Sequence, residues 1–360
     1  MALSATIQPG PPSTSIQRSL GMSGKDFYVF RSSNERPNTQ FIMQPLEHGL
    51  GGKEFPALIP YLNSGRKTVI HCRTIADVFR VFVYLWKAQP EGADRLKRVQ
   101  MYHSLRSFDD NSEILRLLEE DPRCQVVIAT IAFANGLNVK SLLDSLSLGF
   151  PETVDQMWQE KGRVGRNPDT AARGVVFFQP SVLADAEKQI AGLDAPPAAP
   201  QINPKTGKPR CKKKIKPMEH AKALLLIEKR CYIAAINRIY QNPPMETSTL
   251  DCIATKRRLP CSLCAARREI SLTFPPSPLP SGITLPPFTP SVAMQEPLSA
   301  AQKKLKLTKK ERGIAAASLA TFGETIFFLP RLHFHHHTRP SSVSELHNPR
   351  YCDKLMDFCA

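Results

Sequence analysis

The sequence predicts an α/β domain built on a parallel sheet, and two observations support this fold class. Short apolar runs rich in β-branched residues alternate, between residues 66 and 190, with longer segments that show helical periodicity. Strands that alternate with helices are typical of βαβ units, in which neighbouring strands run parallel. Hydrophobic residues make up 42% of the 360-residue chain, enough to bury a core. We therefore expect one domain at 25–192, with helices on both faces of the sheet.

The expected elements of this domain follow one another in a regular order. The strand patterns lie at residues 67–72, 98–103, 125–130, 141–149 and 173–178. The helical patterns lie between them, at 75–88, 111–121 and 152–160. The fourth strand has the weakest pattern, because it begins with alternating Leu and Ser.

The segments outside this domain differ from it in composition. Pro, Ser and Gly dominate the N-terminal end, which we expect to be frayed, and Pro and Lys dominate a linker that is unlike a folded domain. A helical subdomain with one helix at 220–240 comes next, and the tail is predicted to be largely disordered, with a helical pattern at 307–329. These segments are the N-terminal segment 1–24, the linker 193–218, the helical subdomain 219–270 and the Pro-rich, basic tail 271–360.

The charge balance indicates a polyanionic partner. The chain has 48 Lys and Arg against 32 Asp and Glu, a net charge of +16 and a pI near 9.6. Nucleic acid is the simplest such partner, although a basic tail that only keeps the chain in solution gives the same balance. The run KPRCKKKIKP at 208–217 is typical of a nuclear localisation signal or a nucleic-acid patch, and also of a solvated linker. We expect a nuclear protein without signal peptide or membrane span.

A Gly-Arg motif is the first candidate site. In QEKGRVGR, at 159–166, two arginines each follow a glycine, and guanidinium groups on such a backbone are suited to holding phosphate. Ligands of open α/β sheets bind at the carboxyl ends of the strands. We therefore expect this motif and the loop at 129–138, with Gly136, to share that edge. The alternative is that both arginines only pair with local carboxylates.

Five segments resemble the second RecA-like lobe of RecQ-like DNA helicases, in the family's order. Arg36, Pro37 and Asn38 match its Arg-Pro-Asn, whereas Ala134 and Asn135 depart from its Gly-Met. The segments are RSSNERPNTQF (31–41), VIHCRTIADVFRVFVYL (69–85), MYHSLRSFDDNSEILRLLEED (101–121), VVIATIAFANGLN (126–138) and QEKGRVGRNPD (159–169).

The resemblance implies an ATP-dependent 3′–5′ DNA helicase of repair and recombination, with a role for each matching residue. Arg166 corresponds to the finger that reaches the γ-phosphate of ATP, and Arg163 and Gln159 support it. ATP and Mg²⁺ are shared with a first lobe, and the partners are single-stranded DNA and duplex junctions. The further positions implied are Gly136, Asn138, Gly162 and Gly165 for the nucleotide, and Arg73, His103 and Thr130 for the DNA backbone.

The chain lacks the motifs that a first lobe would supply. Gly52-Lys53 is followed by Glu54 and Gly207-Lys208 by Pro209, so neither completes G-x-x-x-x-G-K-[ST], and no Asp-Glu dipeptide occurs. We expect the isolated chain to be inactive and a separate first lobe to be a partner. A truncated, non-catalytic protein that binds DNA or another partner is the alternative. The second lobe of an RNA helicase is disfavoured by the Arg-Pro-Asn segment and the cysteines described next.

Four cysteines form the second candidate site. Cys231 lies in the predicted helix 220–240, Cys252 in a loop, and Cys261 and Cys264 in a C-x-x-C. Four thiolates can close a tetrahedral zinc site, and RecQ-like helicases carry a four-cysteine zinc subdomain directly after this lobe. The eight residues between Cys252 and Cys261 exceed the family's usual spacing. Buried or free thiols are the alternative to zinc.

Overall fold

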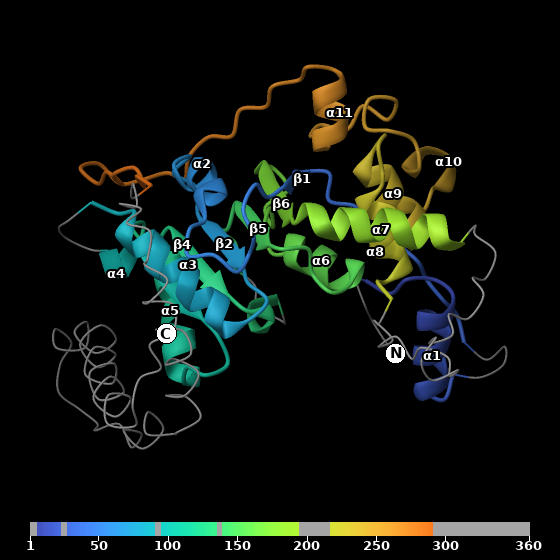
Figure 1. The fold of residues 1–360 in the computed structure, drawn as a ribbon, viewed down its shortest axis with the longest axis horizontal. Helices are drawn as coiled ribbons and strands as arrows, with labels where there is room; N and C mark the ends of the chain where they lie inside the picture. The colour runs from blue at the N-terminus through green and yellow to red at the C-terminus, as the bar shows by residue number, and fades with distance from the viewer. Residues whose placement is uncertain (1–5, 23–26, 91–94, 135–138, 194–216, 291–360) are drawn as a thin grey trace, which may run out of the picture. The chain divides into compact units, whose positions relative to one another are not determined.

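The computed structural model describes residues 6–22, 27–90, 95–134, 139–193 and 217–290 (Figure 1). Its contacts divide the chain into one unit of residues 1–93 and 97–289 and a second of residues 94–96 and 290–360. Nearly all described residues belong to the first unit, and the fold below is that unit's. The linker segment 194–216 and the predicted helix at 307–329 lie outside the described residues.

Six strands form one parallel sheet in the order β1-β6-β5-β2-β4-β3. The five predicted strands are confirmed, and the sheet with its helices confirms the predicted fold class. The sequence did not predict β1, which pairs with β6 along its whole length. The strands are β1 (Thr39–Pro45), β2 (Thr68–His71), β3 (Val99–Tyr102), β4 (Val126–Ala129), β5 (Asp144–Leu148) and β6 (Ala172–Phe178).

The three helices predicted within the sheet domain begin at side-chain caps. The hydroxyls of Thr74, Ser107 and Thr153 accept hydrogen bonds from backbone N–H groups three residues on, which satisfies a donor that the first turn leaves unpaired. The helices are α1 (Pro11–Ser19), α2 (Ile59–Leu62), α3 (Ile75–Lys87), α4 (Arg95–Arg98), α5 (Phe108–Glu120), α6 (Val154–Lys161), α7 (Pro180–Leu193), α8 (His220–Leu226), α9 (Tyr232–Tyr240), α10 (Met245–Ser248) and α11 (Ser262–Arg267), with short 3₁₀ turns at Pro56–Leu58 and Ile131–Ala134.

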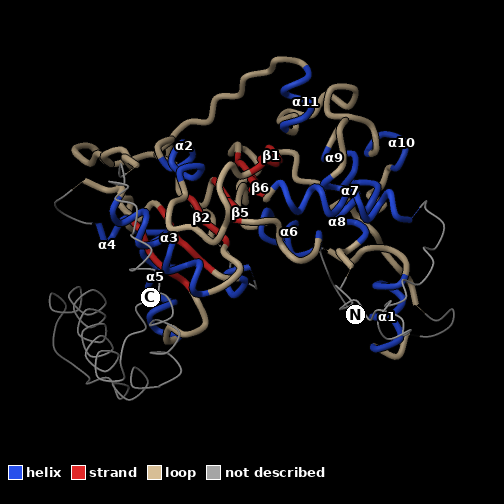
Figure 2. The backbone as a smooth tube through the Cα atoms, in the orientation of Figure 1, coloured by secondary structure: helices blue, strands red, loops and turns tan. Residues whose placement is uncertain are grey.

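Helices cover both faces of the sheet (Figure 2). The strand register places Phe41 and Val69 on one face, where Phe41 packs with α6, α7, α8 and α9 and Val69 packs with α5. Ile70 and Ile128 are buried on the opposite face, on which α3 lies against β3 and β4. Among the described residues, no helix has both the length and the apolar character required to cross a membrane.

The predicted single helix at 220–240 is wrong, because the segment forms two helices. Helix α8 ends at Leu226, and α9 begins after Cys231, whose sulfur accepts a hydrogen bond from the N–H of Ala234. Glu228 also binds the N–H groups of Arg230 and Cys231 in the turn between them. Side chains that bind the backbone locally compete with a continuous helix, and they end it here.

Two segments outside the sheet domain pack onto it. Part of the N-terminal segment forms α1, and Gln8 donates to the carboxylates of Asp155 and Glu219. After α11 the chain runs back toward α2 as an extended strap, residues 271–289 (Figure 1). Phe288 of this strap is 1% exposed and stacks on the guanidinium of Arg98 at 3.9 Å.

Candidate functional site

The Gly-Arg motif lies at the amino-terminal edge of the sheet. Helix α6 starts after the carboxyl end of β5 and runs back along the sheet, so residues 162–166, here the arginine loop, reach the opposite edge. The N–H of Gly165 donates to the carbonyl of Leu142, just before β5, at 3.3 Å. The motif and the loop at 129–138 were predicted to share the carboxyl edge. The structure places Gly165 at the opposite edge, whereas α6 contacts the turn Ile131–Ala134 of that loop, and Gly136 lies outside the described residues. A helix that runs antiparallel to the strands starts at their carboxyl ends and ends near their amino ends, and the loop that follows it lies there.

Arg36 and Asn38 hold the backbone of the arginine loop. The guanidinium of Arg36 donates to the carbonyls of Gly162, Val164 and Gly165 at 3.4, 2.7 and 3.3 Å. The amide of Asn38 donates to the carbonyls of Gly165, Asn167 and Thr170, at 2.8, 3.0 and 3.1 Å. The sequence singled out both residues only as part of a family segment. Their role in shaping the loop needed the structure, because the segments are more than 120 residues apart in the chain.

Three guanidinium groups raise the positive potential of this edge. Burial lowers the pKa of Arg36, and the charge of Arg166 lowers it further. Burial also lowers the pKa of Arg163, and the charges of Arg166 and Arg36 add to this effect. Like charges held within electrostatic range of one another favour the binding of an anion.

Three of the other residues predicted for the nucleotide site lie in or beside this loop. Gln159, on α6, donates to the hydroxyl of Thr6 at 2.9 Å. Gly162 caps the C-terminus of α6. Gly165 has a φ of +61°, and a Cβ at this position would lie 2.9 Å from Cβ of Ala172, so the close approach requires glycine. Gly136 and Asn138 lie outside the described residues.

The three residues predicted to contact DNA follow strands β2, β3 and β4, at the carboxyl edge of the sheet. Arg73 is exposed, whereas His103 and Thr130 are only 2% and 7% exposed. Burial, and secondarily the charge of Arg106, lowers the pKa of His103 to about 4. The structure thus separates an exposed cation from two buried side chains, and the roles of all three remain predictions.

A buried polar network on α6 was not predicted. Lys161 is 1% exposed and donates to the carbonyl of Val175 and the hydroxyl of Ser147, at 2.8 and 2.7 Å. The same hydroxyl donates to the carboxylate of Glu160. Burial lowers the pKa of Lys161 to about 7, against the opposing charge of Glu160. This network fixes α6 to β5 and β6 beside the arginine loop. The sequence did not indicate it, because a Glu-Lys pair is usually exposed.

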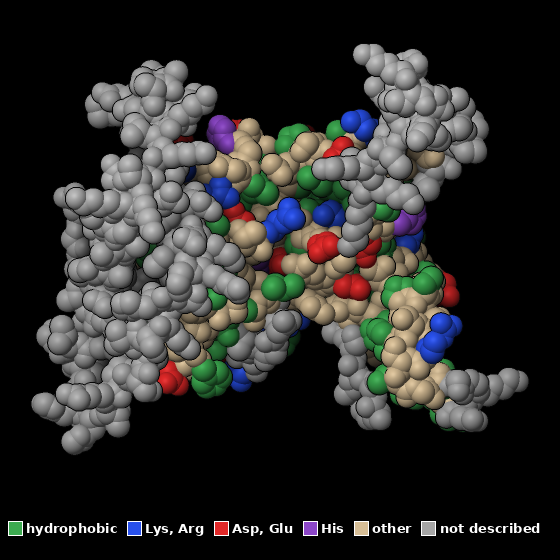
Figure 3. All heavy atoms as spheres, turned by 60° about the horizontal axis from the view of Figure 1, so that its bottom comes forward, with side chains coloured by type: hydrophobic (Ala, Val, Ile, Leu, Met, Phe, Trp, Pro, Cys, Tyr) green, Lys and Arg blue, Asp and Glu red, His purple; other side chains and the backbone are tan. Residues whose placement is uncertain are grey.

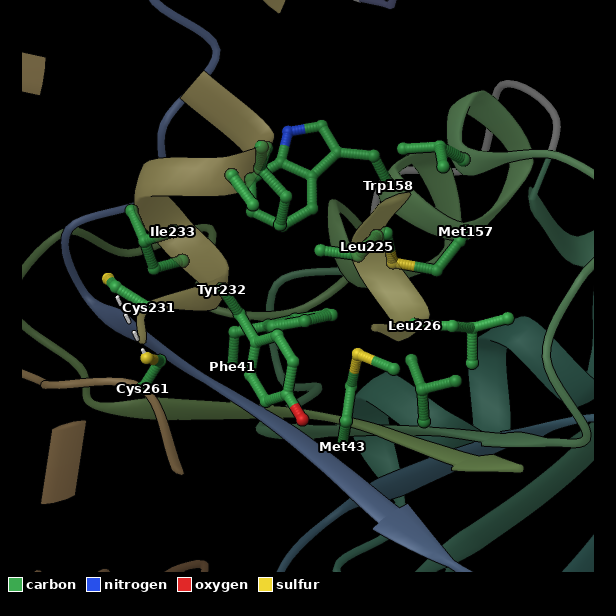
Figure 4. Packing of buried hydrophobic residues seen from close by; sticks show 14 of the residues in the cluster. Phe41, Met43, Met157, Trp158, Leu225, Leu226, Cys231, Tyr232, Ile233 and Cys261 are labelled. Carbon is green, nitrogen blue, oxygen red and sulfur yellow. Dashed lines mark hydrogen bonds between the residues drawn. The ribbon is translucent and has the colours of Figure 1, made fainter. Parts of the chain in front are cut away.

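The four predicted cysteines come together in the subdomain 219–270, here the cysteine module. Their four sulfur atoms all lie within 4.8 Å of one another, and all four residues are buried. The sulfur of Cys231 lies 3.5 Å from that of Cys252 and 3.9 Å from that of Cys261. Figure 4 shows Cys231 and Cys261 facing each other at the edge of the core around Tyr232. The prediction that these four residues form one cluster is confirmed.

This cluster fits a tetrahedral metal site better than a disulfide. A disulfide holds its sulfurs about 2.04 Å apart. In a site with Zn–S bonds of about 2.3 Å the sulfurs lie about 3.8 Å apart, close to both separations above. Hydrogen bonds from the thiols of Cys252 and Cys261 lower the pKa of Cys231, and the N–H of Cys261 donates to the sulfur of Cys252 at 3.4 Å. The donors to Cys231 favour its thiolate, which is the metal-binding form, whereas the hydrogen bond to Cys231 raises the pKa of Cys252.

Comparisons with known proteins agree with this architecture. The family described as helicase conserved C-terminal domain matches residues 53–168. The ATP-dependent DNA helicase RecQ of Pasteurella multocida is 28% identical over 192 residues, which are 51% of this chain and 27% of that protein. RecQ of Haemophilus influenzae is 27% identical over 188 residues, or 52% of this chain and 28% of that protein. The chain thus spans little more than a quarter of the length of these curated relatives.

A solved structure of S. cerevisiae Dbp5 bound to RNA and ADP BeF3 is also similar. It is 14% identical, with a TM-score of 0.39, over 50% of this chain and 46% of that protein. The matched family domain covers β2 to α6 and the arginine loop, and the RecQ relatives extend the match to half of the chain. Residues 53–168 therefore match a helicase conserved C-terminal domain, and about half of the chain is similar to RecQ helicases.

Proposed function

We propose that this lobe supplies Arg166 as the finger, and Arg163 and Gln159 as its support, to an ATP molecule held by a first helicase lobe. The observation that carries the proposal is the set of three guanidinium groups beside one loop; the pKa of two of them is lowered by burial and further by a neighbouring arginine. A triphosphate would relieve this repulsion, and arginine binds phosphate oxygens in bidentate geometry. Gly136, Asn138, Gly162 and Gly165 would shape the backbone around the nucleotide.

A first lobe supplied in trans tests this proposal. The isolated chain, which carries no P-loop sequence, should show no DNA-stimulated ATP hydrolysis. Adding a RecQ-type first lobe that contains the P-loop should give turnover that falls about 10³-fold or more in Arg166→Gln, as for other arginine fingers. Arg116→Gln on α5, where the side chain is half exposed, is the matched control. Equal turnover of Arg166→Gln and Arg116→Gln would contradict the proposed role.

We propose that the whole protein is a nuclear 3′–5′ DNA helicase of repair and recombination, and that single-stranded DNA lies along the carboxyl edge of the sheet. Arg73 would bind a phosphate there, while Thr130 and His103 hold the adjoining loops. Thr130 donates its N–H to the carbonyl of Tyr102 at 3.2 Å, and the carbonyl of His103 accepts from Asn111 at 3.1 Å. The charge run at 208–217 would add nuclear targeting or DNA affinity.

Anisotropy of a labelled single-stranded oligonucleotide measures this contact. Arg73→Gln should weaken binding and make the dependence of log affinity on log salt shallower by about one unit, because one phosphate contact is lost. Basic and acidic side chains lie interspersed on the face shown in Figure 3. The control is Arg116, which lies in the second half of α5. Arg116→Gln should leave the slope unchanged. An unchanged slope in Arg73→Gln would exclude this residue from the DNA path.

We further propose that Cys231, Cys252, Cys261 and Cys264 hold one structural Zn²⁺ ion. Zinc would link α9, the loop at Cys252 and α11, and its binding energy would become folding energy of the module. Purified protein should contain about one zinc per chain, and Cys261→Ser with Cys264→Ser should lose it. Cys72→Ser serves as control, because Cys72 is also buried but lies in the sheet domain. Retention of zinc by the double mutant would assign the metal to other residues.

A non-catalytic protein that only binds DNA or a partner remains the second candidate. The observation in its favour is that the printed sequence contains neither a P-loop motif nor an Asp-Glu dipeptide. The reconstitution above separates the two functions. A chain that binds the oligonucleotide but gives no turnover with any first lobe would be such a protein.

A further inference from the structure

Residues 31–38 contact both candidate sites of this lobe. On one side, Arg36 and Asn38 donate six hydrogen bonds to carbonyl groups of the arginine loop and the residues after it. On the other side, the segment binds the cysteine module. The two sites are therefore linked by one short piece of chain that belongs to neither.

The contact with the cysteine module is centred on Glu35. Its carboxylate accepts from Nε of Arg257 at 2.6 Å, from a second nitrogen of this guanidinium at 3.0 Å, and from the amide of Asn237 at 2.6 Å. The side chains of Arg257 and Glu35 are only 8% and 19% exposed. Burial lowers the pKa of Arg257, but the bond to Glu35 more than offsets this and the pKa is raised. This is a bidentate, partly buried ion pair, the kind with defined geometry.

The neighbours of Glu35 strengthen this attachment. The amide of Asn242 donates to the side-chain oxygen of Asn34 at 2.8 Å, and Arg31 donates to the carbonyl of Tyr240 at 3.1 Å. The indole N–H of Trp158, on α6, donates to the carbonyl of Asn34 at 3.1 Å. The segment is thus fixed to α9 and to the helix that leads into the arginine loop.

The backbone between the two attachments is stiff. Glu35 and Arg36 are adjacent, and Pro37 follows, which fixes its own φ and restricts Arg36 to extended conformations. The N–H of Thr39 donates to the carbonyl of Arg36 at 3.1 Å and closes a β-turn with proline at its second position. A displacement of Glu35 therefore moves Arg36, because few backbone rotations are available to absorb it.

We propose that Glu35 and Arg36 are positioning residues through which the cysteine module sets the place of Arg163 and Arg166. Arg257 holds Glu35, Glu35 places Arg36, and Arg36 holds the carbonyl groups of Gly162, Val164 and Gly165. The role of the two loop arginines in binding ATP rests on the function proposed above, whereas the position of the loop does not. Affinity for a phosphate group would then depend on a module that never touches it.

Hydrogen exchange of the full chain tests this link. Arg257→Gln should accelerate exchange of the amides of Arg163 and Gly165, which donate to the carbonyls of Glu160 and Leu142, about tenfold, or about 1.4 kcal/mol. Amides of β4, remote from the segment, should be unchanged. Arg238→Gln is the matched control, because its ion pair with Glu228, at 2.6 Å, lies within the module. Glu35→Gln leaves every module residue in place and should accelerate the same loop amides.

A second readout follows the side chains themselves. Titration with ATP in the presence of the P-loop-containing first lobe, observed by NMR at the Nε–H groups of Arg163 and Arg166, should show affinity about threefold or more weaker in Arg257→Gln and Glu35→Gln than in Arg238→Gln. Loop exchange in Glu35→Gln equal to that in Arg238→Gln would overturn the proposal, whatever the state of the Arg257 variant. Accelerated loop exchange in a protein whose arginines do not respond to ATP would support the link and reject the nucleotide role.

Discussion

Replacement of Asp144 by asparagine should destabilise the lobe more than any single change at its surface. Asp144 is the first residue of β5, and its side chain is fully buried. It accepts from Nε of Arg66 at 3.0 Å and from Nε of Arg173 at 3.0 Å. The side chains of these arginines are 0% and 12% exposed, so the carboxylate pairs with two guanidinium groups that have little access to water.

The size of the effect follows from this burial. Removing one partner of a buried ion pair costs about 3–5 kcal/mol, because the remaining charge is left without compensation. The substituted amide would still accept a hydrogen bond but would carry no charge. Total stabilities of about 5–15 kcal/mol are usual for single domains, so much of the native stability would be lost. The exposed pair of Glu113 and Arg116 gives the contrast, since such pairs contribute about 0–1 kcal/mol.

Urea denaturation of Asp144→Asn and Glu113→Gln measures the difference. With a slope of about 1–3 kcal/mol per molar urea, a loss of about 3 kcal/mol lowers the midpoint by about 1 M or more. Glu113→Gln should lie within a few tenths of a molar of wild type. A free energy of unfolding for Asp144→Asn within about 1 kcal/mol of wild type would refute the reasoning, and would mean that water or another anion compensates the two arginines.

Three further outcomes are expected. Gly165→Ala should lower the free energy of unfolding by more than about 1 kcal/mol, because φ is +61° and the added Cβ meets Ala172. Gly192→Ala in helix α7 has open space around the added Cβ and should raise the free energy of unfolding, and urea denaturation of both variants measures the difference. The pKa of His103 is about 4 when folded, below its ordinary value of about 6.5, so the unfolded chain binds the proton better. Stability should therefore be complete above about pH 6.5 and fall toward pH 4, by about 3 kcal/mol, and His103→Phe should flatten this profile. Deleting residues 208–217 should reduce the salt dependence of oligonucleotide binding without abolishing it; binding that is independent of salt in the intact chain would contradict an electrostatic contact.

The sequence predicted every strand of the sheet except β1, at one of its two edges. Strands β2 and β4 are buried on both faces and form short apolar runs, which is the pattern expected in parallel sheets. Strand β5 is equally buried, although Leu and Ser alternate in it. Strand β1, TQFIMQP, contains Gln44 and a terminal proline and is an edge strand. Proline is tolerated at such a position because no neighbouring strand requires its N–H. Proline and glutamine are nevertheless untypical of strands, so the sequence pattern did not indicate β1.

The candidate sites show the same division between local and distant information. The cysteines were found from their residue type and spacing, because few residue types other than cysteine bind zinc through sulfur and the C-x-x-C pattern is local in the sequence. The clamp of Arg36 on the arginine loop was not found, since it joins residues 126 to 129 positions apart. The position of Gly165 at the amino-terminal edge was not predicted, for a related reason. It depends on the length and direction of α6 relative to the sheet, which the motif alone does not contain.

The strap at 271–289 has a consequence for the order in which the lobe can form. Asn63 exchanges two hydrogen bonds with the backbone of Phe288, 225 residues later, and the buried Arg66 donates to the carbonyl of Pro275 at 2.6 Å. A ribosome delivers these partners only after the sheet and the cysteine module have been synthesised. Until then, Arg66 and the apolar surface that Phe288 later covers are exposed to the solvent. Closure of the lobe is therefore a late event in synthesis, and nascent chains that stop near residue 270 would present this edge to chaperones.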